Sequence, residues 1–294
     1  MYYLLYIPLY LFSLIPLRVL YLFSDLLFFI SYTVLGYRKK VVLDNLKIAF
    51  PEKTDKERLQ IASAFYHNLA DTLFETIKFI SWRRTSFEKH FSCDLSGMDQ
   101  AYASGKSIYL VGMHNFNWEY VNWGLALKLK YPLVCIYMPL ANKSLDKIIF
   151  DMRARCGSLL IPATNFRNSY APYRSTTHIL GTVADQSPGS PANAYWIEFF
   201  GKPTAFTKGT EKGARMQDAA VVFVHFYKIK RGSYRVDTLF YTDQPKDLEE
   251  GTITRSYAAY IEKCLHEHPD NYLWSHRRWK HEWKEGYEKI MPKA

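Results

Sequence analysis

Cysteine is scarce in this sequence, and its placement argues against two kinds of stabilised site. The 294 residues contain only 4 cysteines, which are scattered and form no C-x-x-C pair. Neither a disulfide framework nor a cysteine zinc site is therefore expected. We interpret them as reduced core or surface residues of a protein that faces the cytosol: Cys93, Cys135, Cys156 and Cys264.

The signatures of several enzyme classes are also missing. No G-x-S-x-G elbow occurs, which argues against a serine hydrolase. Ser104-Gly-Lys-Ser107 resembles half of a Walker A loop, but Gln100 stands where the first glycine should be, and a strand rather than a helix is predicted next. We therefore expect no ATP binding.

Histidines and basic residues near the C-terminus form no recognised site either. His266 and His268, like His276 and His281, lack cysteine or acidic partners at the spacing of zinc ligands, so we expect no metal. Residues 272–280 alternate bulky rings with basic groups, but no RNP, zinc-finger or helix-turn-helix signature accompanies them. We expect no nucleic-acid partner.

Charge is nearly absent from the first 37 residues. Only Arg18 and Asp25 interrupt a run rich in Leu, Ile, Phe and Tyr, and the flanking features of a signal peptide are missing. The run is long enough to cross a bilayer once, although its prolines and tyrosines also allow a helix or hairpin within one leaflet. We predict a hydrophobic membrane anchor over residues 1–37, with the basic residues 38–40 on the cytoplasmic side. The alternative is a helix buried in the protein's own core.

Positive charge is in excess over the whole chain. Lys and Arg number 38 against 28 Asp and Glu, which gives a net charge of +10. Partners should therefore be anionic, such as membrane headgroups, phosphorylated substrates, acidic proteins or nucleic acid. Tyrosine is abundant, with 23 residues, and amphipathic rings in such number suit a membrane–water interface.

Residues 38–294 alternate short apolar runs with amphipathic segments. This rhythm predicts an α/β fold: a single catalytic domain with a central, mostly parallel or mixed sheet flanked by helices. Residues 82–104 are mixed and loop-rich. Strands are expected near 108–111, 132–137, 159–161, 177–184, 219–227 and 234–242, the last two antiparallel, and helices within 41–80, 118–130, 142–155, 207–217 and 252–268.

A polar segment after the first of these strands carries the strongest indication of chemistry. Beyond Ile108–Val111 and Gly112 it contains His114, Asn117 and Glu119, with Asn117 placed to cap a helix. On one helix His114 and Glu119 would point roughly 140° apart. They can meet only if the histidine lies in the strand-to-helix elbow and the acid in the first helical turn. A carboxylate-oriented imidazole there would suit general-base catalysis, and the alternative is that the two residues are unrelated neighbours.

Two further segments are candidates for ligand contacts. Arg153 and Arg155 lie in the last turn of a predicted helix, where their simplest role is to stabilise the helix C-terminus. Asp185 and Gln186 follow a buried strand and precede a Ser-Pro-Gly-Ser-Pro loop. They either line a ligand site or are ordinary turn residues.

Taken in order, these segments resemble one family, the bacterial lipid A biosynthesis (late) acyltransferases, within the wider H-x4-D/E acyltransferases. The chain departs from the usual family elbow at Phe116, where a glycine normally precedes Asn-Trp-Glu. The similarity runs along most of the chain and includes Arg38–Leu46, Phe50-Pro51-Glu52 with Glu57-Arg58, His114–Glu119, Arg153–Gly157, Asp185-Gln186, Phe199–Pro203, and Pro269 with Leu273–Lys280.

The resemblance implies a membrane-bound O-acyltransferase. Such an enzyme moves a fatty acyl chain from a thioester, usually on acyl carrier protein, to a hydroxyl of a membrane glycolipid, here a lipid A precursor. His114 would be the general base, and Glu119 would accept a hydrogen bond from the other ring nitrogen. The acyl thioester is a co-substrate, so no cofactor, metal or covalent acyl-enzyme is required.

Binding roles follow from the same resemblance. Arg153 would hold a phosphate or carboxylate of the substrate or help to stabilise the oxyanion. An acid and an amide would bind the acceptor headgroup or position this arginine, and two aromatic residues would line the groove for the acyl chain. The candidate substrate-binding residues are Arg153, Asp185, Gln186, Asn117, Phe199 and Phe200.

An enzyme of this kind is expected to be a monomer at the cytoplasmic face of the inner membrane. Its partners would be acyl carrier protein, the glycolipid acceptor and an anionic membrane surface. Two alternatives stay open. The same chemistry could act on another lipid acceptor, such as an aminolipid, a lysophospholipid or a glycolipid, or the chain could be a non-catalytic membrane-binding scaffold.

Overall fold

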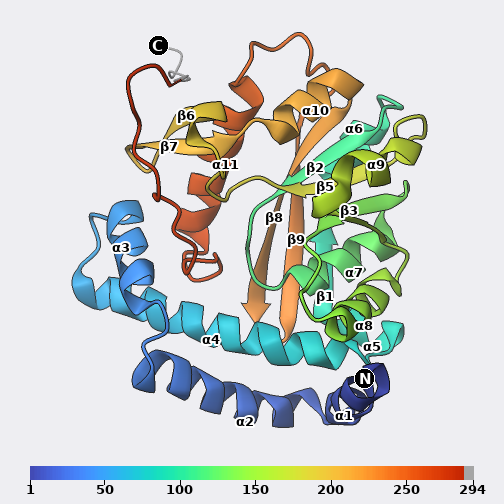
Figure 1. Ribbon diagram of the computed structural model, residues 1–294, viewed down its shortest axis with the longest axis vertical. Coiled ribbons are helices and arrows are strands. Elements are labelled where there is room, and N and C mark those ends of the chain that lie inside the picture. Colours follow the sequence, from blue (N-terminus) through green and yellow to red (C-terminus); the bar gives the residue numbers. More distant parts are fainter. Residues whose placement is uncertain (288–294) are drawn as a thin grey trace.

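Seven strands form the central sheet of the computed structural model, which describes residues 1–287 (Figure 1). Their order is β1-β9-β8-β2-β5-β3-β4. The last five are mutually parallel, whereas β9 is antiparallel to β8 and β1 is parallel to β9. The predicted α/β fold with a mostly parallel sheet is confirmed. The strands are β1 Phe91–Asp94, β2 Ile108–Gly112, β3 Leu133–Tyr137, β4 Leu159–Pro162, β5 Ile179–Val183, β8 Ala220–Lys230 and β9 Ser233–Thr242.

Helices cover both faces of the sheet, and most lie where the apolar spacing predicts them. Two parts of the chain differ from expectation. The segment expected to be loop-rich contains β1 and α6, and an aromatic segment forms an antiparallel hairpin, β6 (Ala194–Phe199) with β7 (Lys202–Thr207). The main helices are α3 Lys39–Ala49, α4 Asp55–Phe79, α6 Ser96–Tyr102, α7 Trp118–Lys128, α8 Lys143–Ala154, α10 Gly209–Gln217 and α11 Thr252–Glu267, with short helices α5 Arg84–Phe87 and α9 Phe166–Tyr170.

Strand β2 lies in the middle of the core. Because successive side chains of a strand point to opposite faces, Tyr109 and Val111 pack into the cluster under α3, α4 and α11, while Ile108 and Leu110 pack into the cluster with α6 and α7. All residues of β2 are therefore buried, as expected for a parallel strand covered on both sides. This burial fixes the position of the segment that follows it.

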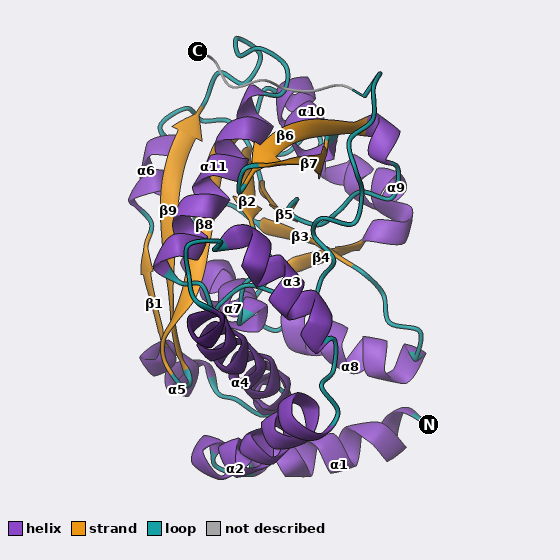
Figure 2. Ribbon diagram, turned by 90° about the vertical axis from the view of Figure 1, so that its left-hand side faces the viewer, coloured by secondary structure: helices purple, strands orange, loops and turns teal. Residues whose placement is uncertain are grey.

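The N-terminal segment forms a helical hairpin, α1 (Tyr2–Leu14) and α2 (Leu17–Phe28), with α2 continued by a short π-helix at Phe29–Val34. The hairpin lies against α4 at one end of the molecule (Figures 1 and 2). One side of α2 is buried, through Tyr21 and Ser24, whereas the other side leaves apolar side chains exposed. Leu17–Val34 is long and apolar enough to cross a membrane, which makes this segment a candidate membrane anchor.

Residues 268–281, which include the basic-aromatic run 272–280, cross the end of β2 and contact the loop that follows it. The backbone amide of Leu273 donates to the carbonyl of His114, and the amide of Phe116 donates to the carbonyl of Asn271, both at 2.9 Å. Asn45 of α3 donates to the Trp274 carbonyl at 2.8 Å. These contacts hold the loop between β2 and α7 from outside the sheet.

Candidate active site

His114 and Asp185 meet because their strands are neighbours in register. Strands β2 and β5 are parallel partners in which Gly112 lies opposite Val183. Two residues beyond that pair, the Nδ1 atom of His114 lies 2.7 Å from Oδ1 of Asp185. The backbone amide of His114 also donates to Oδ2 of Asp185, at 3.2 Å. Polar residues from two adjacent strands thus converge at the carboxyl edge of the sheet, where open α/β folds place their sites.

The environment of this pair favours a charged carboxylate and a basic imidazole. Burial lowers the pKa of His114, but the charge and hydrogen bond of Asp185 outweigh that effect and raise the pKa above 6.5. Burial alone would raise the pKa of Asp185, yet the His114 ring and backbone amide hold it at about 2. The His114 side chain keeps 25% of its surface exposed, whereas that of Asp185 keeps 1%. Asp185 can therefore fix the tautomer while the ring's other nitrogen, Nε2, is left for substrate.

Glu119 has a different partner from the one predicted. Its carboxylate binds Arg153 of α8, with Nη2 of Arg153 2.6 Å from Oε1 and Nε 3.0 Å from each oxygen. The indole N–H of Trp118 donates to Oε1 at 3.0 Å. The expected hydrogen bond from His114 to Glu119 is not among those that the described residues form, so this part of the prediction is wrong. The carboxylate bonded to the His114 ring is instead that of Asp185, which was expected to bind the acceptor headgroup or to position Arg153.

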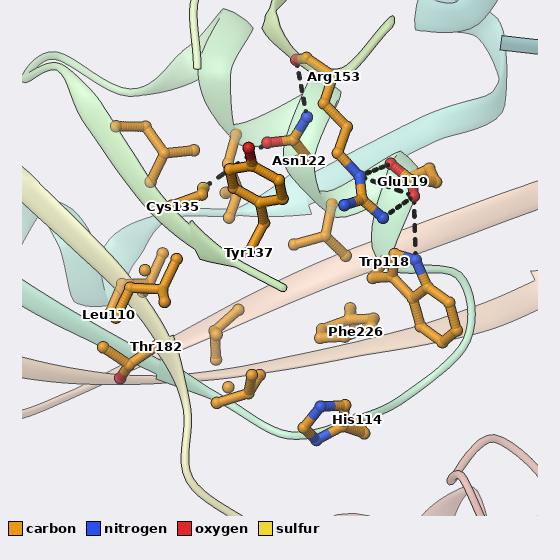
Figure 3. Close-up of a pocket in the computed structure, with 18 of the residues that line it drawn as sticks. Leu110, His114, Trp118, Glu119, Asn122, Cys135, Tyr137, Arg153, Thr182 and Phe226 are labelled. Carbon is orange, nitrogen blue, oxygen red and sulfur yellow. Dashed lines mark hydrogen bonds and ion pairs between the residues drawn. The ribbon is translucent and has the colours of Figure 1, made fainter. Parts of the chain in front are cut away.

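A cavity of about 290 Å³ extends from this region under the sheet. His114, Trp118, Glu119 and Arg153 all contribute to its wall, and Figure 3 shows the imidazole and the Glu119–Arg153 pair on different sides of it. The rest of the wall is mainly apolar and comes from five strands and α7: Leu110, Val121, Leu125, Leu133, Ile136, Leu160, Val183, Val224 and Phe226. An apolar slot beside a basic imidazole can hold a hydrocarbon chain with its reactive end near the base.

Comparison with known proteins assigns the chain. The profile of the bacterial lipid A biosynthesis acyltransferases matches residues 1–281. The chain belongs to this family. It is 25% identical over 250 residues to the lipid A biosynthesis palmitoleoyltransferase of Escherichia coli strain K12, covering 83% of this chain and 79% of that protein. The lauroyltransferase of the same strain is 24% identical over 248 residues, with the same coverage, and a lipid A biosynthesis acyltransferase of Haemophilus influenzae is 23% identical over 233 residues, covering 78% and 72%.

The family assignment makes the chain an acyltransferase with a lipid acceptor and an acyl donor. Within this acyltransferase, the predicted site residues divide into two groups. The structure brings His114, Glu119, Arg153 and Asp185 to one region. Gln186 is half-buried and is not among the residues that line the cavity.

The aromatic pair expected in the acyl groove lies elsewhere in the acyltransferase. Phe199 is fully buried and packs against Phe206 and Trp279, and Phe200 packs against Phe50. Neither residue lines the cavity beside His114. The structure therefore does not bring this pair to the cavity beside the imidazole. The cavity that could hold an acyl chain instead lies between the sheet and α7, and apolar residues of the parallel strands form one of its walls.

Asn117 has a structural role at the start of α7. Its Oδ1 accepts a hydrogen bond from the backbone amide of Glu119 at 2.9 Å, which confirms the predicted helix cap. The side chain is fully buried and does not line the cavity, so it is not placed to bind substrate. Phe116, where the family usually has glycine, is also fully buried and packs against Phe65 and Trp118.

Several cavity residues were not predicted from sequence. Cys135 of β3 and Asn122 of α7 line the wall, and burial raises the pKa of the Cys135 thiol to about 12. A thiol with this pKa stays protonated and behaves as an apolar wall group rather than a nucleophile. The sequence offered one indication only, namely that Cys135 lies on a predicted strand and Asn122 on a predicted helix. In the described part of the chain, no group of three or more His, Cys, Asp or Glu side chains could hold a metal ion.

Proposed function

We propose that this acyltransferase transfers a fatty acyl chain from a thioester to a hydroxyl group of a lipid A precursor at a membrane surface. The observation that carries the proposal is the His114–Asp185 pair at the wall of an apolar cavity, in a chain of this family. All three relatives named above are lipid A biosynthesis acyltransferases, two of them a palmitoleoyltransferase and a lauroyltransferase, which supports the same acceptor class here.

His114 is the general base in this proposal. A lipid hydroxyl is a weak nucleophile, so Nε2 of His114 removes its proton as the oxygen attacks the thioester carbon. Asp185 keeps the ring proton on Nδ1 and stabilises the imidazolium that forms. When the tetrahedral intermediate collapses, the carbon–sulfur bond breaks, and the imidazolium proton passes to the departing thiolate. The products are an ester on the acceptor and a free thiol on the donor, and no group is left on the enzyme.

Glu119 and Arg153 hold an anionic part of the substrate in this proposal. Glu119 engages Nε and Nη2 of Arg153, which fixes the plane of the guanidinium on the cavity wall. The remaining N–H groups can then donate to a phosphate or carboxylate with little loss of side-chain freedom. Glu119 thus contributes to binding through Arg153, instead of orienting the base as the sequence suggested.

The exposed side of the α1–α2 hairpin brings the cavity to the lipid. Its apolar side chains are suited to the acyl region of one leaflet, and the excess of 10 positive charges favours an anionic surface. The same positive charge would attract the acyl donor, which we take to be an acidic acyl carrier protein. We place the enzyme as a monomer on the cytoplasmic face of the inner membrane.

An acyl-transfer assay with labelled acyl thioester tests the proposal. His114→Ala should reduce the rate by about 10²-fold or more, because the base supplies a factor of this size. Mass spectrometry of lipids from a strain lacking the gene should show lipid A without one acyl ester. Normal turnover by His114→Ala would refute the mechanism, and loss of an acyl ester from a different lipid would refute the acceptor.

A further inference from the structure

Glu75 is a fully buried carboxylate on α4 that receives three hydrogen bonds. The amide Nδ2 of Asn117 and the hydroxyl of Tyr234 each donate to its Oε2 at 2.9 Å. The hydroxyl of Tyr21, on α2, donates to Oε1 at 2.7 Å. Burial, with the nearby Asp71 carboxylate, raises the pKa of Glu75 in spite of the opposing effect of the donors from Asn117, Tyr21 and Tyr234. The carboxylate therefore joins the anchor hairpin, the sheet and the start of α7.

The bond from Asn117 determines which way its side-chain amide faces. An asparagine side chain has one oxygen that accepts and one nitrogen that donates. Oε2 of Glu75 accepts from the amide nitrogen of Asn117, which leaves Oδ1 of Asn117 to cap the backbone amide of Glu119. If Glu75 did not accept, the amide would be free to reverse, and the cap on α7 would be lost.

We propose that Glu75 is a positioning residue for acyl transfer. By holding the Asn117 amide it sets the first turn of α7, and this turn carries Glu119 to its ion pair with Arg153 on the cavity wall. Glu75 itself does not line the cavity and touches no reacting group. The inference deepens the proposed function and rests on it.

Asn117→Asp separates this role from ordinary helix capping. Asp is as good a cap as Asn, and its charge suits a helix N-terminus. A purely local cap would therefore tolerate the change. Next to Glu75, however, the new carboxylate replaces a donor with an acceptor. Combining it with Glu75→Gln restores a donor, because the new amide nitrogen has two hydrogens, one for the new carboxylate and one for the Tyr234 hydroxyl, which then accepts. The oxygen of the new amide can still accept from Tyr21.

The expected result in the acyl-transfer assay is a loss and a rescue. Asn117→Asp should lower kcat/KM by about tenfold or more. The relative changes in kcat and in KM should match those measured for Glu119→Gln, because both variants act through the Glu119–Arg153 pair. The double variant Glu75→Gln/Asn117→Asp should return to within about threefold of wild type. Either a wild-type rate for Asn117→Asp or a double variant no better than Asn117→Asp would overturn the inference.

Glu211 provides a matched control for general loss of stability. It is another buried glutamate, on α10, and it accepts three hydrogen bonds at the start of α11, from the backbone amides of Gly251 and Thr254 and the Thr254 hydroxyl. It does not line the cavity. Glu75→Ala should lower kcat/KM much more than Glu211→Ala at a comparable loss of Tm. Equal losses would overturn the inference. A wild-type enzyme that transfers no acyl chain to lipid would refute the proposed function, and the inference with it.

Discussion

The charges of His114 and Asp185 decide when the proposed base is available. A general base acts in its neutral form, and Asp185 raises the pKa of His114 above 6.5 in spite of burial. The imidazole is thus charged at mildly acidic pH and becomes an active base only as the pH rises through this raised value. Because Asp185 itself has a pKa of about 2, it stays ionised throughout that range.

Asp185→Asn should change both the rate and its pH dependence. Without the carboxylate, burial is the dominant influence on His114, so its pKa falls and the acidic limb of kcat/KM moves to lower pH. The maximal rate should fall by about 10²-fold, because the imidazolium loses its stabilising charge. Rates measured from about pH 5 to pH 9 test this. Asp99→Asn, which removes an exposed carboxylate paired with Lys130, should leave the profile in place. An unmoved acidic limb in Asp185→Asn would contradict the assignment.

The same pair makes stability depend on pH. The folded pKa of Asp185 is depressed from 3.8 to about 2, so its contribution is present above pH 3.8 and is lost as the pH falls toward 2. The folded pKa of His114 is raised, so its contribution is present below pH 6.5 and is lost as the pH rises through the folded value. The depression of the Asp185 pKa alone corresponds to about 2 kcal/mol. Denaturant unfolding should show the largest gap between wild type and Asp185→Asn at pH values between roughly 4 and 6.5, and a larger gap at alkaline pH would be contrary evidence.

Helices α7 and α8 are joined by the ion pair of Glu119 and Arg153. The side chain of Glu119 is 1% exposed and that of Arg153 is 23% exposed. A buried carboxylate that loses its cation has no access to water, whereas a guanidinium that loses its carboxylate can still reach solvent in the cavity. The two halves of the pair should therefore differ in the cost of their removal.

Arg153→Met should destabilise the protein more than Glu119→Gln. We expect losses of about 3 kcal/mol and about 1 kcal/mol in the free energy of unfolding, and a double variant that costs less than the sum. Lys147 and Asp151 form an exposed ion pair on the same helix, so replacing Lys147 by alanine should cost about 0.5 kcal/mol or less. Chemical denaturation of the variants tests the order, and a larger loss for Glu119→Gln would reverse the argument.

At the level of elements, apolar spacing predicted most of the sheet and its flanking helices. It missed β1 because four residues with alternating burial give too short a pattern. The capping asparagine and the strand-to-helix elbow were also predicted, because both depend on residues adjacent in sequence. The partner of His114 was not, since Asp185 is 71 residues away and reaches the imidazole only through the pairing of β2 with β5. Local spacing favoured Glu119, and strand order decided otherwise.

The whole molecule has one strongly apolar end, formed by the α1–α2 hairpin against α4 (Figure 1). Polar contacts hold α2 to the body of the protein: the Ser24 hydroxyl donates to Asp71 at 2.6 Å, and Asp25 pairs with Arg231 at 2.5 Å. A helix that crossed the bilayer alone would have to break these contacts and place Asp25 in hydrocarbon. The arrangement therefore favours a hairpin that lies along one leaflet, with its exposed side in the lipid.

Two measurements test this in-plane attachment. Leu22→Glu with Leu26→Glu places charges on the exposed side of α2. Each change loses about 2 kcal/mol of apolar burial in lipid, so binding of the double variant to anionic vesicles should fall by about 1000-fold. Leu239→Glu, an exposed position on β9, should leave vesicle binding unchanged. Cysteines placed at Leu4 and Leu35 should both react with a membrane-impermeant maleimide from the cytoplasmic side alone. Labelling of the two cysteines from opposite sides would show that the segment crosses the bilayer. In that case α2 would have to separate from α4.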